Sequence, residues 1–180
     1  MKNTFRHPVL LACGLLLASC NLPQPQPDLV RHFTLSAPVD TVAVADSVTV
    51  HPVQLAGHLR SRAMAVRVSD NEVVYLEDIR WAEPLNEAIT QSLRSRLRSV
   101  GGGASVSVQV QRCELVRSEG NTVQLAATYT MAFAGGPAQT GSFTATRRTW
   151  DGKDHGALIG LLREAVGELA DALAAAAAAK

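Results

Sequence analysis

The sequence lacks the residue groupings that mark most enzymes and metalloproteins. It contains no His-Glu-x-x-His or Cys-x-x-Cys spacing and no Gly-x-Ser-x-Gly elbow. Its longest glycine run, residues 101–103, lacks the Gly-Lys-Ser/Thr ending of a phosphate-binding loop and follows a predicted helix instead of preceding one. The histidines beyond the N-terminus are scattered, at positions 32, 51, 58 and 155. We therefore expect no catalytic residue, no metal site and no cofactor, and hence no enzyme.

Cysteine is scarce, and charge is nearly balanced. Of the three cysteines, Cys13 lies in a predicted leader and Cys20 at its end, which leaves Cys113 without an intramolecular partner. We therefore expect no disulfide, and we interpret Cys113 as a small buried hydrophobic residue, not as a reactive thiol. The chain has 17 basic and 16 acidic residues. This balance argues against a nucleic-acid-binding surface.

The N-terminal apolar run is too short to span a membrane, which takes roughly 20 residues. Lys2 and Arg6 precede the run, and small residues follow it, so residues 1–19 are typical of a secretory signal. The sequence Leu17-Ala18-Ser19-Cys20 resembles the lipobox of bacterial lipoproteins. That resemblance implies that Cys20 is acylated and becomes the new N-terminus. An ordinary cleaved signal with a chance cysteine is the alternative.

The residues after Cys20 are typical of a membrane tether. Prolines alternate with glutamines up to Pro27, which favours an extended, semi-rigid spacer. Asn21, in place of an aspartate, resembles lipoproteins that are sorted to the outer membrane. We predict a signal over 1–19, an anchor and tether over 20–30, one domain over 31–174 and an Ala-rich tail over 175–180.

Short segments of β-branched and apolar residues after the tether predict four strands. They cover residues 32–36, 48–55, 63–68 and 73–76. Pro52 should interrupt the second strand or confine it to a sheet edge. The last two strands should form a hairpin across residues 69–71.

A helix is predicted over residues 86–100, with Pro84 in its first turn and the glycines at 101–103 ending it. Its apolar stripe consists of Leu85, Ile89, Leu93 and Leu97. Three longer alternating strands should follow, the first with a bulge near Gln111, where its apolar phase changes. A second amphipathic helix begins after residue 155, and its alanines beyond residue 173 have little to bury and should fray.

This order of elements predicts an α+β fold. Turn residues between the later strands favour an antiparallel meander, and two one-sided helices need a single apolar sheet face to cover. We expect a two-layer sandwich, with an antiparallel or mixed sheet of about six or seven strands and both helices packed on one face.

The segment between the hairpin and the first helix, where we expect Arg80 and Trp81 to lie in a turn, carries a more specific signal. Tyr75 and the sequence Arg80-Trp81-Ala82-Glu83-Pro84-Leu85, together with the helix, resemble the central motif of the ABC-type transport auxiliary lipoproteins, the PqiC-like family. The resemblance extends over roughly residues 32–172. It is specific at residues 75–85 and weak over the last two strands. In the loop at 55–63, four residues depart from the family pattern, namely Ala56, His58, Arg60 and Ala63.

The resemblance implies a non-catalytic periplasmic lipoprotein held at the outer membrane by Cys20. It would be an auxiliary subunit of an MCE-type intermembrane lipid transport system that supports envelope integrity. Its partners would be an MCE-type substrate-binding protein and inner-membrane components, with a possible ring of copies of this chain. The residues we assign to partner contact are Arg60, Arg62, Tyr75, Arg80, Trp81, Glu83 and Pro84.

Two alternatives stand beside this interpretation. Trp81 can fill the core while Arg80 pairs with Glu83 or Asp78, which is compatible with a docking role nearby. The protein can also be a carrier that binds lipid or another small ligand inside its own fold, because the strands over residues 106–133 offer ample apolar surface. A normal hydrophobic core explains that surface equally well.

Overall fold

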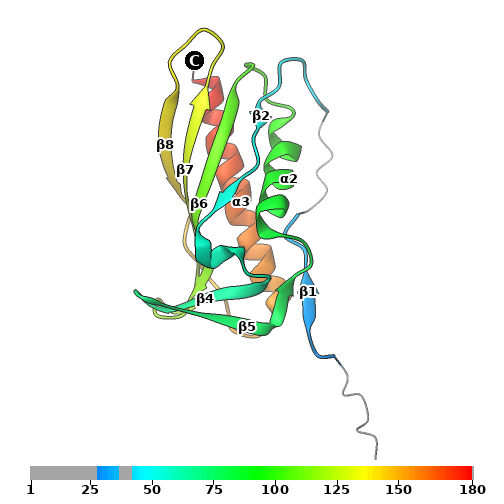
Figure 1. Cartoon of the computed structure of the whole chain (residues 1–180), viewed down its shortest axis with the longest axis vertical. Helices are drawn as coiled ribbons and strands as arrows, with labels where there is room; N and C mark the ends of the chain where they lie inside the picture. Colours follow the sequence, from blue (N-terminus) through cyan, green and yellow to red (C-terminus); the bar gives the residue numbers. More distant parts are fainter. Residues whose placement is uncertain (1–27, 37–41, 180) are drawn as a thin grey trace, which may run out of the picture.

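The computed structural model describes residues 28–36 and 42–179, and the predicted signal, Cys20 and most of the tether lie outside this part. Within it the chain forms an α+β fold in which one mixed sheet carries two helices (Figure 1). The strands before the first helix are β1 (Arg31–Phe33), β2 (Thr49–Val50), β3 (Gln54–Leu55), β4 (Ala63–Ser69) and β5 (Glu72–Trp81). The remaining strands are β6 (Ser105–Val116), β7 (Thr122–Ala132), β8 (Gln139–Thr144) and β9 (Arg148–Thr149).

The longest strand, β6, organises the sheet, whose order is β1-β5-β4-β6-β7-β8. One side of β6 pairs antiparallel with β7 along its length. The other side pairs in succession with β2, β3 and the end of β4, all parallel. Pro52 separates β2 from β3, as predicted, because proline cannot donate a ladder hydrogen bond. This split and the short β9 give nine strands within the described residues, more than the six or seven expected.

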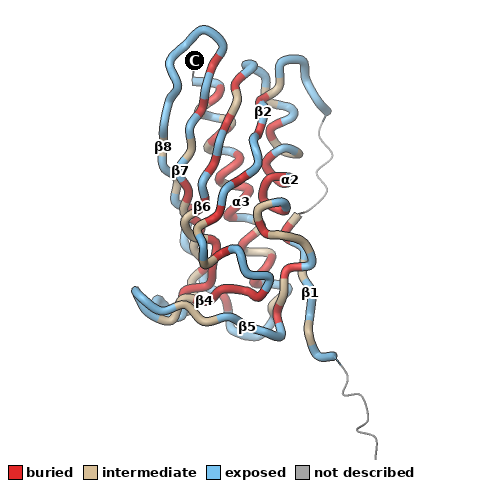
Figure 2. The backbone as a smooth tube through the Cα atoms, in the orientation of Figure 1, coloured by how far each residue is buried: buried red, intermediate tan, exposed pale blue. Residues whose placement is uncertain are grey.

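The apolar alternation of β6 and β7 places their inner faces in the core. Val106, Val108 and Val110 are buried, and after a register shift between Val110 and Arg112 the buried phase resumes at Cys113 and Leu115. The predicted bulge is therefore confirmed. Facing residues of β7, from Val123 to Met131, are buried as well, apart from the half-buried Tyr129. Figure 2 shows that burial follows this inner layer along β6, β7 and the facing sides of the helices.

The helices α2 (Leu85–Leu97) and α3 (His155–Ala178) lie against the sheet and each other (Figure 1). All four residues of the predicted α2 stripe are at most 3 % exposed, and Leu158, Leu162, Leu169 and Leu173 of α3 are fully buried. Complete burial of one leucine side chain stabilises a fold by about 1.5–3 kcal/mol. Asp154 begins α3 as an N-cap that accepts hydrogen bonds from the N–H groups of Gly156 and Ala157.

Three boundaries differ from the predictions. Arg80 and Trp81 belong to β5 and not to a turn, because β1 pairs in parallel with residues Ile79 to Trp81 and extends the strand. Helix α2 ends at Leu97, since the carbonyl oxygens of Arg98 and Val100 accept hydrogen bonds from the chain before β2. Helix α3 continues to Ala178, because Ala177 is buried, so its last turn does not fray in this structure.

Candidate functional site

Three predicted contact residues lie on or beside a corner formed by the 3-10 turn η2 (Gly57–Arg60) and the β4–β5 hairpin. Arg60 and Arg62 are exposed at the end of η2 and just after it. Tyr75 of β5 is 39 % exposed, and its hydroxyl donates a 3.0 Å hydrogen bond to the carbonyl oxygen of His58. We call His58, Arg60, Arg62 and Tyr75 the η2 corner.

A buried carboxylate lies beneath the η2 corner. Glu114 of β6 is 0 % exposed, and its Oε1 accepts a 2.6 Å hydrogen bond from Nε of Arg67 on β4. The other oxygen, Oε2, lies within hydrogen-bond distance of Nε2 of His58, at 3.1 Å. Arg67 and His58 are themselves partly buried, with 12 % and 27 % of their side chains exposed. The three side chains therefore fix η2 to the middle of the sheet.

Sequence reasoning missed Glu114. Cys113 and Leu115 carry the apolar phase of the strand, so the alternation assigns Glu114 to a solvent-facing side. In the structure η2 covers that side and removes Glu114 from water. One available signal was the position of this lone carboxylate between Cys113 and the apolar pair Leu115-Val116.

The other predicted contact residues take structural positions near the start of α2. Trp81 is 3 % exposed and packs in the core, as its alternative interpretation proposed. Glu83 accepts hydrogen bonds from both the hydroxyl and the N–H of Ser36, and thus joins the chain after β1 to the entry of α2. Pro84 is the residue that precedes the helix, at its N-cap position.

The predicted ion pair of Arg80 with Glu83 or Asp78 is wrong. Arg80 instead pairs with Glu77, at 3.4 Å between Nη2 and Oε2, and its Nε donates to the carbonyl oxygen of Glu77. The β4–β5 ladder jumps from Leu76 to Arg80, so the intervening residues bulge and bring Glu77 beside the guanidinium. Both side chains are well exposed, so this pair contributes little to stability.

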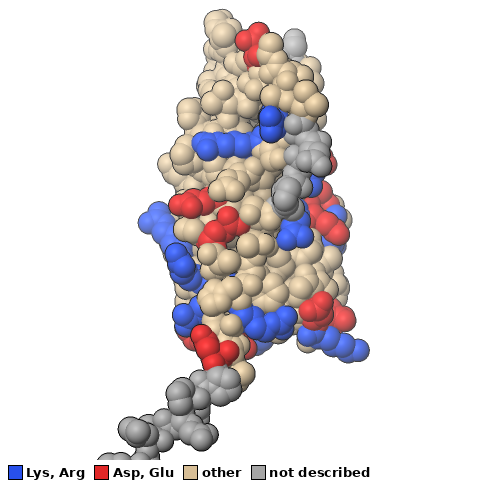
Figure 3. Space-filling view, turned by 90° about the vertical axis from the view of Figure 1, so that its right-hand side faces the viewer, with Lys and Arg blue, Asp and Glu red and all other residues tan. Residues whose placement is uncertain are grey.

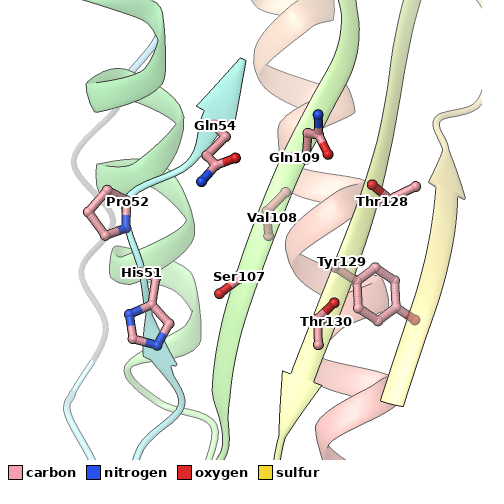
Figure 4. Close-up of a pocket in the computed structure, with 9 residues that line it drawn as sticks. All are labelled: His51, Pro52, Gln54, Ser107, Val108, Gln109, Thr128, Tyr129 and Thr130. Carbon is pink, nitrogen blue, oxygen red and sulfur yellow. The ribbon is translucent and has the colours of Figure 1, made fainter. Parts of the chain in front are cut away.

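Three open hollows on the described surface are lined by polar and apolar side chains in different proportions. One, of about 450 Å³, lies on the sheet face opposite the helices. In Figure 4 its lining residues come from the β2–β3 segment, from β6 and from β7: His51, Pro52, Gln54, Ser107, Val108, Gln109, Thr128, Tyr129 and Thr130. Two smaller ones, of about 370 and 320 Å³, flank the start of α2.

The sequence contains two kinds of chemically active group, namely potential metal ligands and a free thiol. They hold no cluster of three or more His, Cys, Asp or Glu side chains arranged to bind a metal ion. Cys113 is a free, buried thiol, and burial together with the neighbouring Glu114 raises its pKa to about 12. A thiol with such a pKa is protonated at neutral pH and is a poor nucleophile. The interpretation of Cys113 as a buried strand residue is confirmed.

On one face of the molecule, charges of both signs are mixed. Figure 3, which views the molecule from the side that lies at the right in Figure 1, shows basic and acidic side chains interspersed, with no large patch of one sign. Within residues 28–36 and 42–179, no helix combines the length and hydropathy needed to cross a membrane.

The described chain is therefore a single α+β sandwich, and the contacts among Arg67, Glu114 and His58 support its η2 corner. A family model described as ABC-type transport auxiliary lipoprotein component matches residues 33–174. Because this match covers most of the sequence, the chain belongs to that family, as the motif around Tyr75 and Arg80 suggested, and its role is that of an auxiliary component associated with transport.

Solved structures support the fold. A crystal structure of an uncharacterized protein has a TM-score of 0.64 at 15 % identity and covers 79 % of this chain and 95 % of its own. The crystal structure of protein XCC0632 from Xanthomonas campestris, a DUF330 protein, has a TM-score of 0.62 at 16 % identity, with 81 % and 91 % covered. At such identities the likeness concerns the fold alone. A search of curated proteins finds no match.

Proposed function

We propose that this protein is a non-catalytic, lipid-anchored subunit of an MCE-type intermembrane lipid transport system, located on the periplasmic side of the outer membrane. The observation that carries the proposal is the family match, which covers nearly all of the folded part of the chain. The membrane, the transported class of molecule and the means of attachment go beyond the family match and are part of the proposal. The protein would contribute to envelope integrity by positioning its partners and not by transforming a substrate.

Attachment depends on Cys20. An acylated cysteine holds a protein on a bilayer because each buried methylene contributes about 0.8 kcal/mol and more than one chain makes binding stable. The described part of the chain begins at residue 28, close to β1, so a tether over 20–30 joins the anchor to one edge of the sheet.

Metabolic labelling with palmitate tests this attachment. The wild-type chain should take up label and fractionate with the outer membrane, whereas Cys20→Ser should take up none and should leave the membrane fraction. The matched control is Cys13→Ser, which removes another cysteine of the leader and should leave labelling unchanged. A wild-type chain that is unlabelled and free in the periplasm would contradict the proposal.

Partner contact is assigned to the η2 corner. Arg60 and Arg62 provide exposed guanidinium groups, Tyr75 an amphipathic ring, and such residues are enriched at the energetic centres of protein interfaces. The buried Arg67–Glu114–His58 contacts hold η2 in place, so the surface is organised before a partner arrives. The proposed partners are an MCE-type substrate-binding protein and, through it, the inner-membrane components. Copies of this chain can also assemble with one another.

Charge reversal at the corner tests this assignment. Arg60→Glu with Arg62→Glu should abolish complementation of a deletion strain in an outer-membrane permeability assay, while the chain stays folded and membrane-bound. The control, Arg98→Glu with Lys153→Glu, changes the net charge equally at two other exposed positions. Equal loss of complementation by both double variants would refute a specific role for the η2 corner.

The alternative function, a carrier that encloses lipid, receives less support. Acyl chains need an apolar cavity, whereas the hollow of about 450 Å³ is lined mainly by hydroxyl, amide and imidazole groups and is open to solvent. Native mass spectrometry of the purified protein separates the two functions. Co-purification of one lipid per chain, beyond the acyl groups on Cys20, would favour the carrier.

A further inference from the structure

One edge of the sheet is left without the features that normally protect a strand from pairing with another chain. Within the described residues, β8 is the last strand of the sheet and pairs only with β7; it forms the outer border of the sheet in Figure 1. Its six residues make six consecutive pairs with β7 and no bulge. It contains neither proline nor a charged residue, both of which natural proteins place on exposed edges to prevent strand addition.

The absence of charge extends well beyond β8. No Asp, Glu, Lys or Arg occurs from Gly120 to Thr146, although 18 % of the whole chain is charged. This stretch contains β7, β8 and the loop between them. The opposite edge strand, β1, is different, because it has only three residues and begins with Arg31. The β8 edge can therefore meet an identical edge without bringing like charges together.

The ladder between β7 and β8 determines which backbone groups face outward. The N–H of Ala145 donates to the carbonyl oxygen of Leu125 on β7, at 2.9 Å. Alternate residues of an antiparallel strand direct their backbone N–H and C=O groups to the same neighbouring strand. The backbone groups of Phe143 and Gly141 therefore also point toward β7. The N–H and C=O groups of Thr140, Ser142 and Thr144 therefore point away from it, and all three residues are exposed.

We propose that β8 is a homotypic docking site, at which two copies of this chain join their sheets by antiparallel pairing of β8 with β8 about a two-fold axis at Ser142. In this register Ser142 faces Ser142 of the second copy, and Thr140 faces its Thr144, so every outward N–H finds a carbonyl. Small hydroxyl side chains meet on the outer face, and cross-strand Thr and Ser pairs of this kind are favourable. On the inner face Gly141 lies opposite Phe143 of the second copy.

The two-fold arrangement favours a second copy over an unrelated strand. An isologous contact needs a surface that complements itself, and a charge-free strand with matched hydroxyl residues on either side of Ser142 meets that need. The pairing closes at two copies, so a larger ring would require a different contact as well. The inference specifies the self-association included in the proposed function, but it rests on β8 alone and not on the transport partners.

Disulfide trapping in cells that express the full chain provides the test. In a hydrogen-bonded antiparallel pair the two Cα atoms lie about 5.5 Å apart, within the range that a disulfide spans. Ser142→Cys should therefore give a reducible dimer after mild oxidation. Thr128→Cys is the matched control, because Thr128 is exposed and lies directly opposite Ser142 on the neighbouring strand β7. Two Thr128 positions would be about 14 Å apart, three strand spacings, and should not cross-link.

A second pair of variants tests the two-fold register. Ser142→Lys and Ser142→Glu each place like charges face to face and should abolish the dimer, while an equal mixture of the two should restore it. Ser142→Pro removes one outward N–H per copy but no bond to β7, and should weaken self-association roughly 5- to 150-fold with the fold intact.

The outcomes are decisive in both directions. Failure of Ser142→Cys to form a dimer, equal trapping at Thr128, or capture of a different protein at position 142 would overturn the proposal. A dimer that forms normally in cells where no transport component is recovered with this protein would retain the β8 contact and reject the transport function. Recovery of transport components with no dimer would do the reverse.

Discussion

Removal of Arg67 gives the sharpest test of how the η2 corner is built. Arg67→Met keeps most of the side-chain volume but removes the guanidinium that lies 2.6 Å from Glu114, leaving the fully buried Glu114 with His58 as its remaining hydrogen-bond partner. Breaking a buried ion pair on one side costs about 3–5 kcal/mol, because the other charge stays buried without compensation. Since domains of this size have stabilities of about 5–15 kcal/mol, the loss is a large share of the total.

Urea denaturation, followed by circular dichroism, measures this effect as a change in the free energy of unfolding. The double variant Arg67→Met with Glu114→Leu removes both charges, and we expect it to be much more stable than Arg67→Met alone. Glu77→Gln is the control, because it breaks the exposed pair with Arg80 and should cost less than about 1 kcal/mol. A cost below 1 kcal/mol for Arg67→Met, or additive effects of the two substitutions, would refute a buried, coupled ion pair.

Three further predictions concern single groups. Cys113 should not react with a thiol reagent such as DTNB at neutral pH until the protein unfolds, and rapid labelling of the native protein would contradict this. Its pKa in the folded protein is raised to about 12 from the ordinary 9.0. The contribution of the protonated thiol to the free energy of unfolding should therefore be complete below pH 9 and decline above it. The hydrogen bond from Arg148 lowers the pKa of Glu168, so its stabilising effect should be present at neutral pH and disappear as the pH falls below the ordinary 4.5. The stability difference between wild type and Glu168→Gln, measured by urea titration, should therefore shrink in acid, and a constant difference would oppose this assignment. Asp154→Ala should cost about 0.5–2 kcal/mol through loss of the α3 N-cap, whereas Asp154→Asn, which retains an acceptor, should cost less in the same assay.

The regular elements were predictable because their periodicity has one physical cause. Leucine or isoleucine at every fourth position identifies the buried side of α2, and alternate valines identify that of β6, because only one side of each element faces the core. The bulge after Val110 was predictable for the same reason, since an apolar pattern that changes phase requires an extra residue.

The corner itself depends on packing between distant segments, which periodicity does not encode. Glu114 becomes buried because η2, over fifty residues earlier, covers the outer side of β6. Likewise, Arg80 is part of a strand because β1 extends the sheet at that point, and a bulge then selects Glu77 as its partner. Local sequence signals favoured a turn and a different acidic partner for Arg80, and tertiary contacts determined the outcome instead.

In the proposed function, this protein acts by contacting the other subunits of a transport complex. The most direct measurement is recovery of its partners after a photo-cross-linking amino acid is placed at Arg62, at the η2 corner, and at exposed Asp171 on α3 for comparison. We expect position 62 to capture a periplasmic MCE-type protein and to recover inner-membrane ABC components with it, and position 171 to capture neither. Capture of no transport component from position 62, with the protein anchored and folded, would contradict the proposed function.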